Sequence, residues 1–221
     1  MPNWCSNELT VTSKTGNEDA LRKLKEFVRD DEPYHGRCSE SFKWVLNPDT
    51  GKGESVEIPD ACKHDDPFKD SCDKKYHEFS FQEIIPMPIE LRHTSSPVDI
   101  YETQEDLDKH LDELQVKYAE DDDRLGFFKS IASKAQTRKY SDNLKKLYGA
   151  DNWYDWCHEQ WGTKWDTNES YCEDGGWVLR YDFDTAWCPP ENICYTLRDM
   201  FPDLEIGWFY REEGMEMAGY L

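Results

Sequence analysis

The sequence lacks the features that would place the chain in a membrane or on nucleic acid. No apolar run approaches the roughly 20 residues that a membrane-spanning helix needs. The first residues have neither the basic nor the apolar region of a signal peptide. Basic residues are scarce, because 26 Lys and Arg stand against 47 Asp and Glu, for a formal net charge of −21. Since affinity for nucleic acid depends largely on Lys and Arg, we expect an acidic protein of the cytoplasm that does not favour nucleic acid.

Familiar catalytic motifs are also missing from the sequence. It contains no H-E-x-x-H, G-x-S-x-G, P-loop or G-x-G-x-x-G pattern. Cys157 and His158 are adjacent, but neighbouring side chains on a helix point about 100° apart and do not form a nucleophile–base pair. We therefore name no catalytic residue, and the sequence leaves open whether the chain is an enzyme.

The eight cysteines are an even number, yet thiols stay reduced in the cytosol, so we expect most to be small buried apolar residues. Three of them lie with histidines in an irregular segment, residues 34–77. Zinc prefers four nitrogen or sulfur ligands, and it would stabilise a segment that has a poor core. The sequence therefore offers a structural zinc site at Cys38, Cys62, His64 and Cys72. Free thiols and disulfide pairing are the alternatives.

The alternation and helical spacing of apolar residues predict an α+β fold. Strands are expected around Leu9 and Val11, over 79–85, over 177–183, over 204–210 and in 215–221. Helices are expected after Asn17 and after Pro190. Without insertions the order is strand, helix, strand, strand, helix, strand, which is the ferredoxin-like βαββαβ order, with an extra C-terminal strand. We expect a single domain over 1–221, with an irregular insertion at 34–77 and an acidic helical insertion at 95–147.

Three motifs carry a resemblance to a known family. They are Pro2-Asn3-Trp4-Cys5-Ser6-Asn7-Glu8, then Gln160-Trp161-Gly162-Thr163-Lys164-Trp165-Asp166, then Phe183-Asp184-Thr185-Ala186-Trp187-Cys188-Pro189-Pro190. They resemble the YubB/Api-type ferredoxin-like family of phages, prophages and plasmids, over residues 1–31, 79–90 and 148–221. The resemblance implies the same fold and an origin on a mobile element, and it implies no activity. Gln160 stands where that family has Asn, and Cys188 where it has Ser.

The second and third motifs combine aromatic residues with Lys, Asp and Thr. Such a set can line a ligand pocket in which a few polar groups stand on apolar walls. The candidate residues are Trp161, Lys164, Trp165, Asp166, Asp184 and Trp187. The alternative is a structural corner, in which the tryptophans fill the core and Lys164 pairs with one of the two aspartates.

Acidic residues gather in the segment 99–123, where eleven Asp and Glu stand against two Lys, a net charge of −9. Thr103 and Asp106 have the spacing of a capping box, and Leu107, Leu111 and Leu114 form a narrow apolar stripe. Acidic faces can attract basic proteins and imitate the phosphates of DNA. The candidate contact residues are Asp106, Asp112, Glu113, Glu120, Asp121, Asp122 and Asp123.

The sequence thus favours a phage- or plasmid-encoded accessory protein that binds a basic host or phage protein, in an anti-defence or DNA-mimic role. A solvated helix face without a partner is the simpler alternative. A second alternative is a nucleic-acid-binding module that stacks bases on sheet aromatics such as Trp177 and Tyr181. A third is an enzyme with a site around Lys164, Asp166 and Asp184.

Overall fold

The computed structural model describes residues 3–34, 42–46, 53–57, 75–92, 94–117 and 134–221. Side chains are described for residues 3–30, 77–92, 94–117 and 134–221. The chain divides into two compact units, one made of Met1–Arg29 with Glu78–Leu221 and the other of Asp30–His77. In the described part of the chain, no helix is both long enough and apolar enough to cross a membrane.

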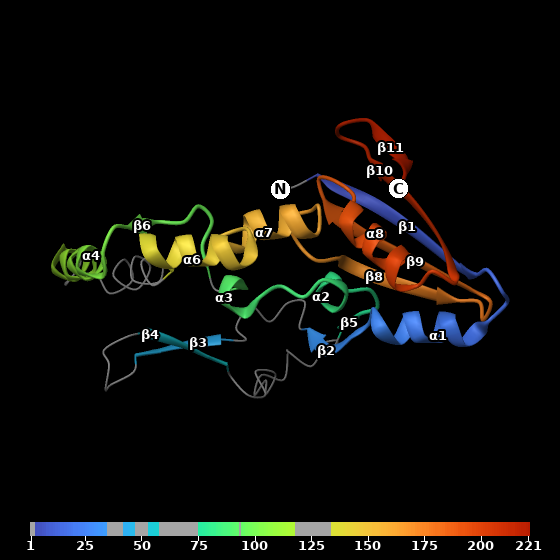
Figure 1. Cartoon of the computed structure of the whole chain (residues 1–221), viewed down its shortest axis with the longest axis horizontal. Helices are drawn as coiled ribbons and strands as arrows, with labels where there is room; N and C mark the ends of the chain where they lie inside the picture. Colours follow the sequence, from blue (N-terminus) through green and yellow to red (C-terminus); the bar gives the residue numbers. More distant parts are fainter. Residues whose placement is uncertain (1–2, 35–41, 47–52, 58–74, 93, 118–133) are drawn as a thin grey trace, which may run out of the picture. The chain divides into compact units, whose positions relative to one another are not determined.

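Five strands from the two ends of the chain form the main sheet (Figure 1). They are β1 (Trp4–Ser13), β8 (Asn168–Asp174), β9 (Val178–Ala186), β10 (Leu204–Glu212) and β11 (Met217–Tyr220). Their order in space is β11-β10-β1-β9-β8, and all neighbours are antiparallel. With helices α1 (Glu18–Phe27) and α8 (Glu191–Met200), the chain order is β1-α1-β8-β9-α8-β10. This is the ferredoxin-like order, so the predicted fold class and the extra strand β11 are confirmed.

One face of the sheet holds the core. Alternate residues of the strands are buried there, among them Leu9, Tyr181 and Trp208. Helices α1 and α8 add leucine and isoleucine side chains to the same cluster, because their apolar residues recur at helical spacing. Phe79 stacks on Phe183, with ring centroids 5.0 Å apart.

The strand predicted over 79–85 is wrong. Residues Phe81–Ile84 form a short helix, α2, and the Ser80 side chain accepts a hydrogen bond from the backbone N–H of Gln82 at its start. Phe79 and Phe81 are both buried, so their alternation imitates a strand. The second strand of the fold is β8, and the acidic helical segment therefore lies between α1 and β8 along the chain. Helix α1 ends at Phe27, and β2 (Asp30–Tyr34) follows it.

Several short elements lie between α1 and β8. They are α3 (Ile89–Arg92), β6 (Ile100–Tyr101), α4 (Gln104–Lys117), β7 (Gln136–Thr137), α6 (Arg138–Tyr148) and α7 (Trp153–Gln160). Strands β6 and β7 form a parallel pair.

The predicted capping box is present at the start of α4. The backbone N–H of Asp106 donates to Thr103 Oγ1, and that of Thr103 donates to Asp106 Oδ2, each at 3.1 Å. Gly149 ends α6 in the left-handed region, with φ +83°.

The second unit, Asp30–His77, has two small antiparallel sheets. One pairs β2 with β5 (Lys75–His77), and the other pairs β3 (Phe42–Leu46) with β4 (Gly53–Glu57). Asp30 lies opposite His77, at the two ends of the unit. Just outside it, the backbone N–H of Ser80 donates to the carbonyl of Val28 at 2.8 Å. The predicted zinc ligands Cys38, Cys62, His64 and Cys72 lie outside the described residues.

A buried carboxylate joins α6 to α7. Asp151 is 4% exposed and accepts hydrogen bonds from Ser141 and Asn152. It also forms an ion pair with Lys145, whose Nζ is 2.9 Å away. Burial alone would raise the pKa of Asp151, but these partners lower it below its ordinary value of 3.8. The carboxylate form is therefore favoured in the folded protein, and Asp151 stabilises the fold most when it is ionised.

We expect Asp151→Asn to lower the free energy of unfolding at about pH 7 by about 1–3 kcal/mol, because Lys145 and Ser141 lose a charged partner. A lowered pKa gives a contribution that is present above the unfolded value and lost as the pH falls through the folded value. The difference between wild type and variant should thus shrink towards about pH 3 in urea unfolding. Asp142→Asn, at an exposed position of α6, is the control; a difference that is equal at both pH values would contradict this prediction.

Candidate functional site

A strained turn follows β9 at one end of the sheet. Trp187 has φ +72°, and the backbone N–H of Cys188 donates to the carbonyl of Ala186 at 2.9 Å. This is a γ-turn of the rare kind whose central residue has positive φ. Such a conformation is costly for a bulky side chain and persists only where the surrounding contacts hold it.

Hydrogen bonds from three segments hold this turn. The backbone N–H of Trp187 donates to the carbonyl of Asn3 at 3.0 Å. Thr163 Oγ1 donates to the carbonyl of Ala186 at 2.9 Å, and Thr185 Oγ1 donates to that of Cys188 at 2.8 Å. The turn is therefore anchored to the start of β1 and to the loop after α7.

The buried amide of Asn7 extends this network into the sheet. Its Nδ2 donates to Thr185 Oγ1 at 2.9 Å, and its Oδ1 accepts from Trp208 Nε1 at 3.1 Å. Asn7 is 1% exposed, so an unpaired amide would be costly there. Sequence reasoning assigned no role to Asn7, although a polar residue at an inward position of an alternating strand is a visible signal.

Three tryptophans around this end of the sheet are partly exposed: Trp4 by 41%, Trp165 by 37% and Trp187 by 43%. The rings of Trp4 and Trp165 lie 6.3 Å apart. Lys164 Nζ lies 4.3 Å from the centroid of the Trp165 ring and 5.5 Å from that of Tyr154, both within cation–π distance. No role was predicted for Trp4 from the sequence.

The structure places the six predicted pocket residues in different environments. Trp161 is buried, and its Nε1 donates to the carbonyl of Ile85 at 2.8 Å. Lys164, Trp165 and Trp187 lie at the surface, whereas Asp184 lies on β9 opposite Ser6 of β1. Lys164 takes no part in the ion pairs of the described side chains, so neither of the predicted Lys–Asp pairs forms.

Asp166 has a structural role. Its Oδ1 accepts from the backbone N–H groups of Phe81 and Thr167, both at 2.7 Å. Its Oδ2 accepts from Ser80 Oγ at 2.9 Å and from the Gln82 N–H at 3.1 Å. Burial raises the pKa of Asp166, and these four hydrogen bonds oppose the rise. With all of these partners inside the protein, Asp166 fixes the start of α2.

Two buried thiols of the described part of the chain have strongly raised pKa values. Burial raises the pKa of Cys157 to about 12 and that of Cys5 to about 11, so both thiols stay protonated at neutral pH. Over the described side chains, no group of three or more His, Cys, Asp or Glu could hold a metal ion.

The two residues suggested to stack bases differ in exposure. Tyr181 is fully buried, whereas Trp177 is 70% exposed but precedes β9 in a turn.

The structure describes three of the seven contact residues predicted in the acidic segment. Asp106, Asp112 and Glu113 are exposed on α4, and Asp106 also closes the capping box. Lys109 Nζ lies 4.0 Å from Glu113. Glu120, Asp121, Asp122 and Asp123 lie outside the described residues.

The positive φ of Trp187 makes a direct prediction about stability. We expect Trp187→Gly to be more stable than Trp187→Ala by about 1 kcal/mol, because only Gly adopts positive φ without strain. Both variants remove the ring, so the difference reports the backbone alone. Trp165→Gly and Trp165→Ala form the matched control pair, in which Ala should be at least as stable. Urea unfolding measures all four; a more stable Trp187→Ala would contradict the strain.

Comparison with known proteins gives a partial match. A family model described as "Ferredoxin-like domain in Api92-like protein" matches residues 160–221. The crystal structure of a protein api92 from Yersinia pseudotuberculosis is similar over 100% of this chain and 93% of that one, at 15% sequence identity and a TM-score of 0.42. No curated protein matches the chain. Residues 160–221, which contain β8 to β11 together with Trp165 and Trp187, are thus similar to the ferredoxin-like domain of Api92-like proteins.

Proposed function

We propose that the chain acts by binding a basic protein, through carboxylates displayed by α4. The observation that carries the proposal is the one-sided arrangement of this helix. Leu107 and Leu114, seven residues apart, are buried on one side. Glu105, Asp108 and Asp112 follow at spacings of three and four, so they share the opposite, exposed side.

Among the described side chains, few cations compensate these carboxylates. The Glu102–Arg138 pair is 2.7 Å long, and its carboxylate lies just before the helix. Among the described residues, Lys109 pairs only with Glu113. Within the described residues, Glu105, Asp108 and Asp112 form no ion pair. Their charge is therefore available to steer a basic partner towards the helix.

The rest of the acidic segment belongs to the same proposal. Glu120, Asp121, Asp122 and Asp123 follow α4 in the sequence and would extend the negative charge beyond Lys117. The partner would be a basic host or phage protein, and the role an anti-defence or DNA-mimic one inside the host cytoplasm. The support for an origin on a phage or plasmid is the sequence resemblance described above.

A charge-reversal experiment tests this function. We expect Glu105→Lys/Asp108→Lys/Asp112→Lys to lose a basic protein that the wild type retains from bacterial lysate at low salt and releases as salt rises. The helix should still form, because these positions are exposed.

The control is Asp199→Lys/Asp203→Lys, two exposed acidic positions far from α4 in the sequence. This variant should retain the same protein. Equal retention by wild type and the α4 variant, or loss from both variants alike, would count against a role of α4.

For the second unit we propose a structural zinc ion held by Cys38, Cys62, His64 and Cys72. The support is the ligand chemistry of the sequence. Elemental analysis of protein never exposed to chelator should find about one zinc per chain, and replacement of Cys62 by Ser should remove it. Cys194→Ser, at a buried thiol of the other unit, is the control. Zinc well below one per chain in the wild type would exclude the site.

A further inference from the structure

The outward side of the five-stranded sheet is a second polar surface. Along β1 the side chains alternate, so that Cys5 and Leu9 are buried whereas Glu8 and Thr10 are exposed. Strand β9 alternates in the same way, with Asp182 exposed. Since the helices and the core occupy one face, the exposed residues mark the other face.

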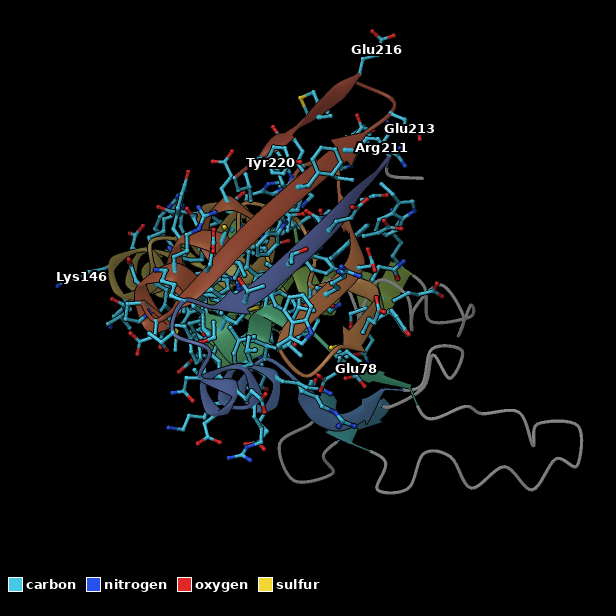
Figure 2. All side chains as sticks on the ribbon, turned by 90° about the vertical axis from the view of Figure 1, so that its right-hand side faces the viewer. Glu78, Lys146, Arg211, Glu213, Glu216 and Tyr220 are labelled. Atoms are coloured by element: carbon cyan, nitrogen blue, oxygen red, sulfur yellow. The ribbon has the colours of Figure 1, made fainter. Side chains whose placement is uncertain are left out.

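One row of residues crosses this outward face from edge to edge. Residues directly opposite each other in antiparallel strands point to the same side. From β11 to β8 the row reads Tyr220, Phe209, Glu8, Asp182 and Tyr171. Tyr220 is 80% exposed and Tyr171 is 62% exposed. Tyr220 lies on the β10–β11 hairpin, whose turn carries Glu213 and Glu216 (Figure 2). Two carboxylates in the middle of the sheet are thus flanked by aromatic rings.

The central pair of this row opposes two like charges. Glu8 and Asp182 are direct cross-strand partners. Like charges in this position destabilise a sheet, and a cation between them would relieve the repulsion.

Two arginines of this face, Arg180 and Arg211, pair with other carboxylates. Arg180 lies 3.5 Å from Glu173, and Arg211 lies 3.7 Å from Glu213. The two central carboxylates, Glu8 and Asp182, therefore form no ion pair of their own with the described side chains.

We infer that this sheet face is a docking surface for an arginine-bearing segment of a protein partner, with a guanidinium group between Glu8 and Asp182. Arginine fits better than lysine, because its planar guanidinium pairs with carboxylates in a fork and also stacks on aromatic rings. Tyr171 and Phe209 lie on either side of the two carboxylates for that purpose. The surface differs from α4, so each proposal can fail alone.

The charge of the row favours a basic protein segment over nucleic acid. Exposed rings on a sheet can stack bases, but phosphates would meet Glu8 and Asp182 at the centre. At one end of the sheet, away from this row, a cation already lies against a ring, since Lys164 lies over Trp165. An approaching cation is therefore the chemistry that fits both the rings and the carboxylates.

Peptide titration tests the inference. The probe is a synthetic peptide of alternating Arg and Gly, with a Lys–Gly peptide of equal length for comparison, followed by calorimetry at about 0.15 M salt to screen distant charges. The wild type should bind the Arg peptide more tightly. Glu8→Gln/Asp182→Asn should raise its Kd at least about tenfold, as expected for the loss of charge-assisted hydrogen bonds.

The matched control is Asp199→Asn/Asp203→Asn, which changes the net charge by the same amount. It should change the Kd less than about twofold, because screened charges outside the contact contribute little. Equal weakening by both double variants would show attraction by net charge alone and overturn the inference. Tighter binding of single-stranded RNA than of the Arg peptide would overturn it in favour of a nucleic-acid surface.

The free protein provides a second readout. Glu8→Gln/Asp182→Asn should raise the urea midpoint of unfolding, because it removes a like-charge pair. Higher stability together with weaker peptide binding is the signature of charges kept for a partner. A lower midpoint would mean that the two carboxylates have a structural role, and would also overturn the inference.

Discussion

The buried amide of Asn7 is the interaction on which the centre of the sheet depends. It lies on the middle strand and is shared between Thr185 on one neighbouring strand and Trp208 on the other. A polar group without a partner is costly in a core, so the amide requires both strand registers at once. Thr185 Oγ1 in turn donates to the carbonyl of Cys188, so the same buried network also holds the strained turn at Trp187.

The fold was predictable where a local signal decides the structure. Asn17 caps α1 and apolar alternation marks β9 and β10, as expected. The segment 79–85 was not predictable in this way, because Phe79 and Phe81 alternate like a strand while Asp166, which accepts from the Phe81 N–H, lies far along the chain. Strand β8 has mostly polar residues and lies at an edge, so it gives almost no hydrophobic pattern.

The sequence could predict which types of residue the candidate sites contain, but not where their side chains lie in the fold. Tryptophans and aspartates serve equally in a core and at a surface, and spacing does not tell which side of a loop they face. Trp161 and Asp166 therefore prove structural, while Trp165 is exposed. The opposition of Glu8 and Asp182 depends on a strand register between residues more than 170 positions apart, which no local pattern contains.

The place where Asp30–His77 joins the rest of the chain has a consequence for the stability of the sheet. Its two ends are adjacent, since Asp30 lies opposite His77 and the Ser80 N–H donates to Val28. Whatever lies between them closes like a loop, and the cost of loop closure grows only slowly with length. Insertions and deletions within Asp30–His77 should therefore cost the sheet little stability.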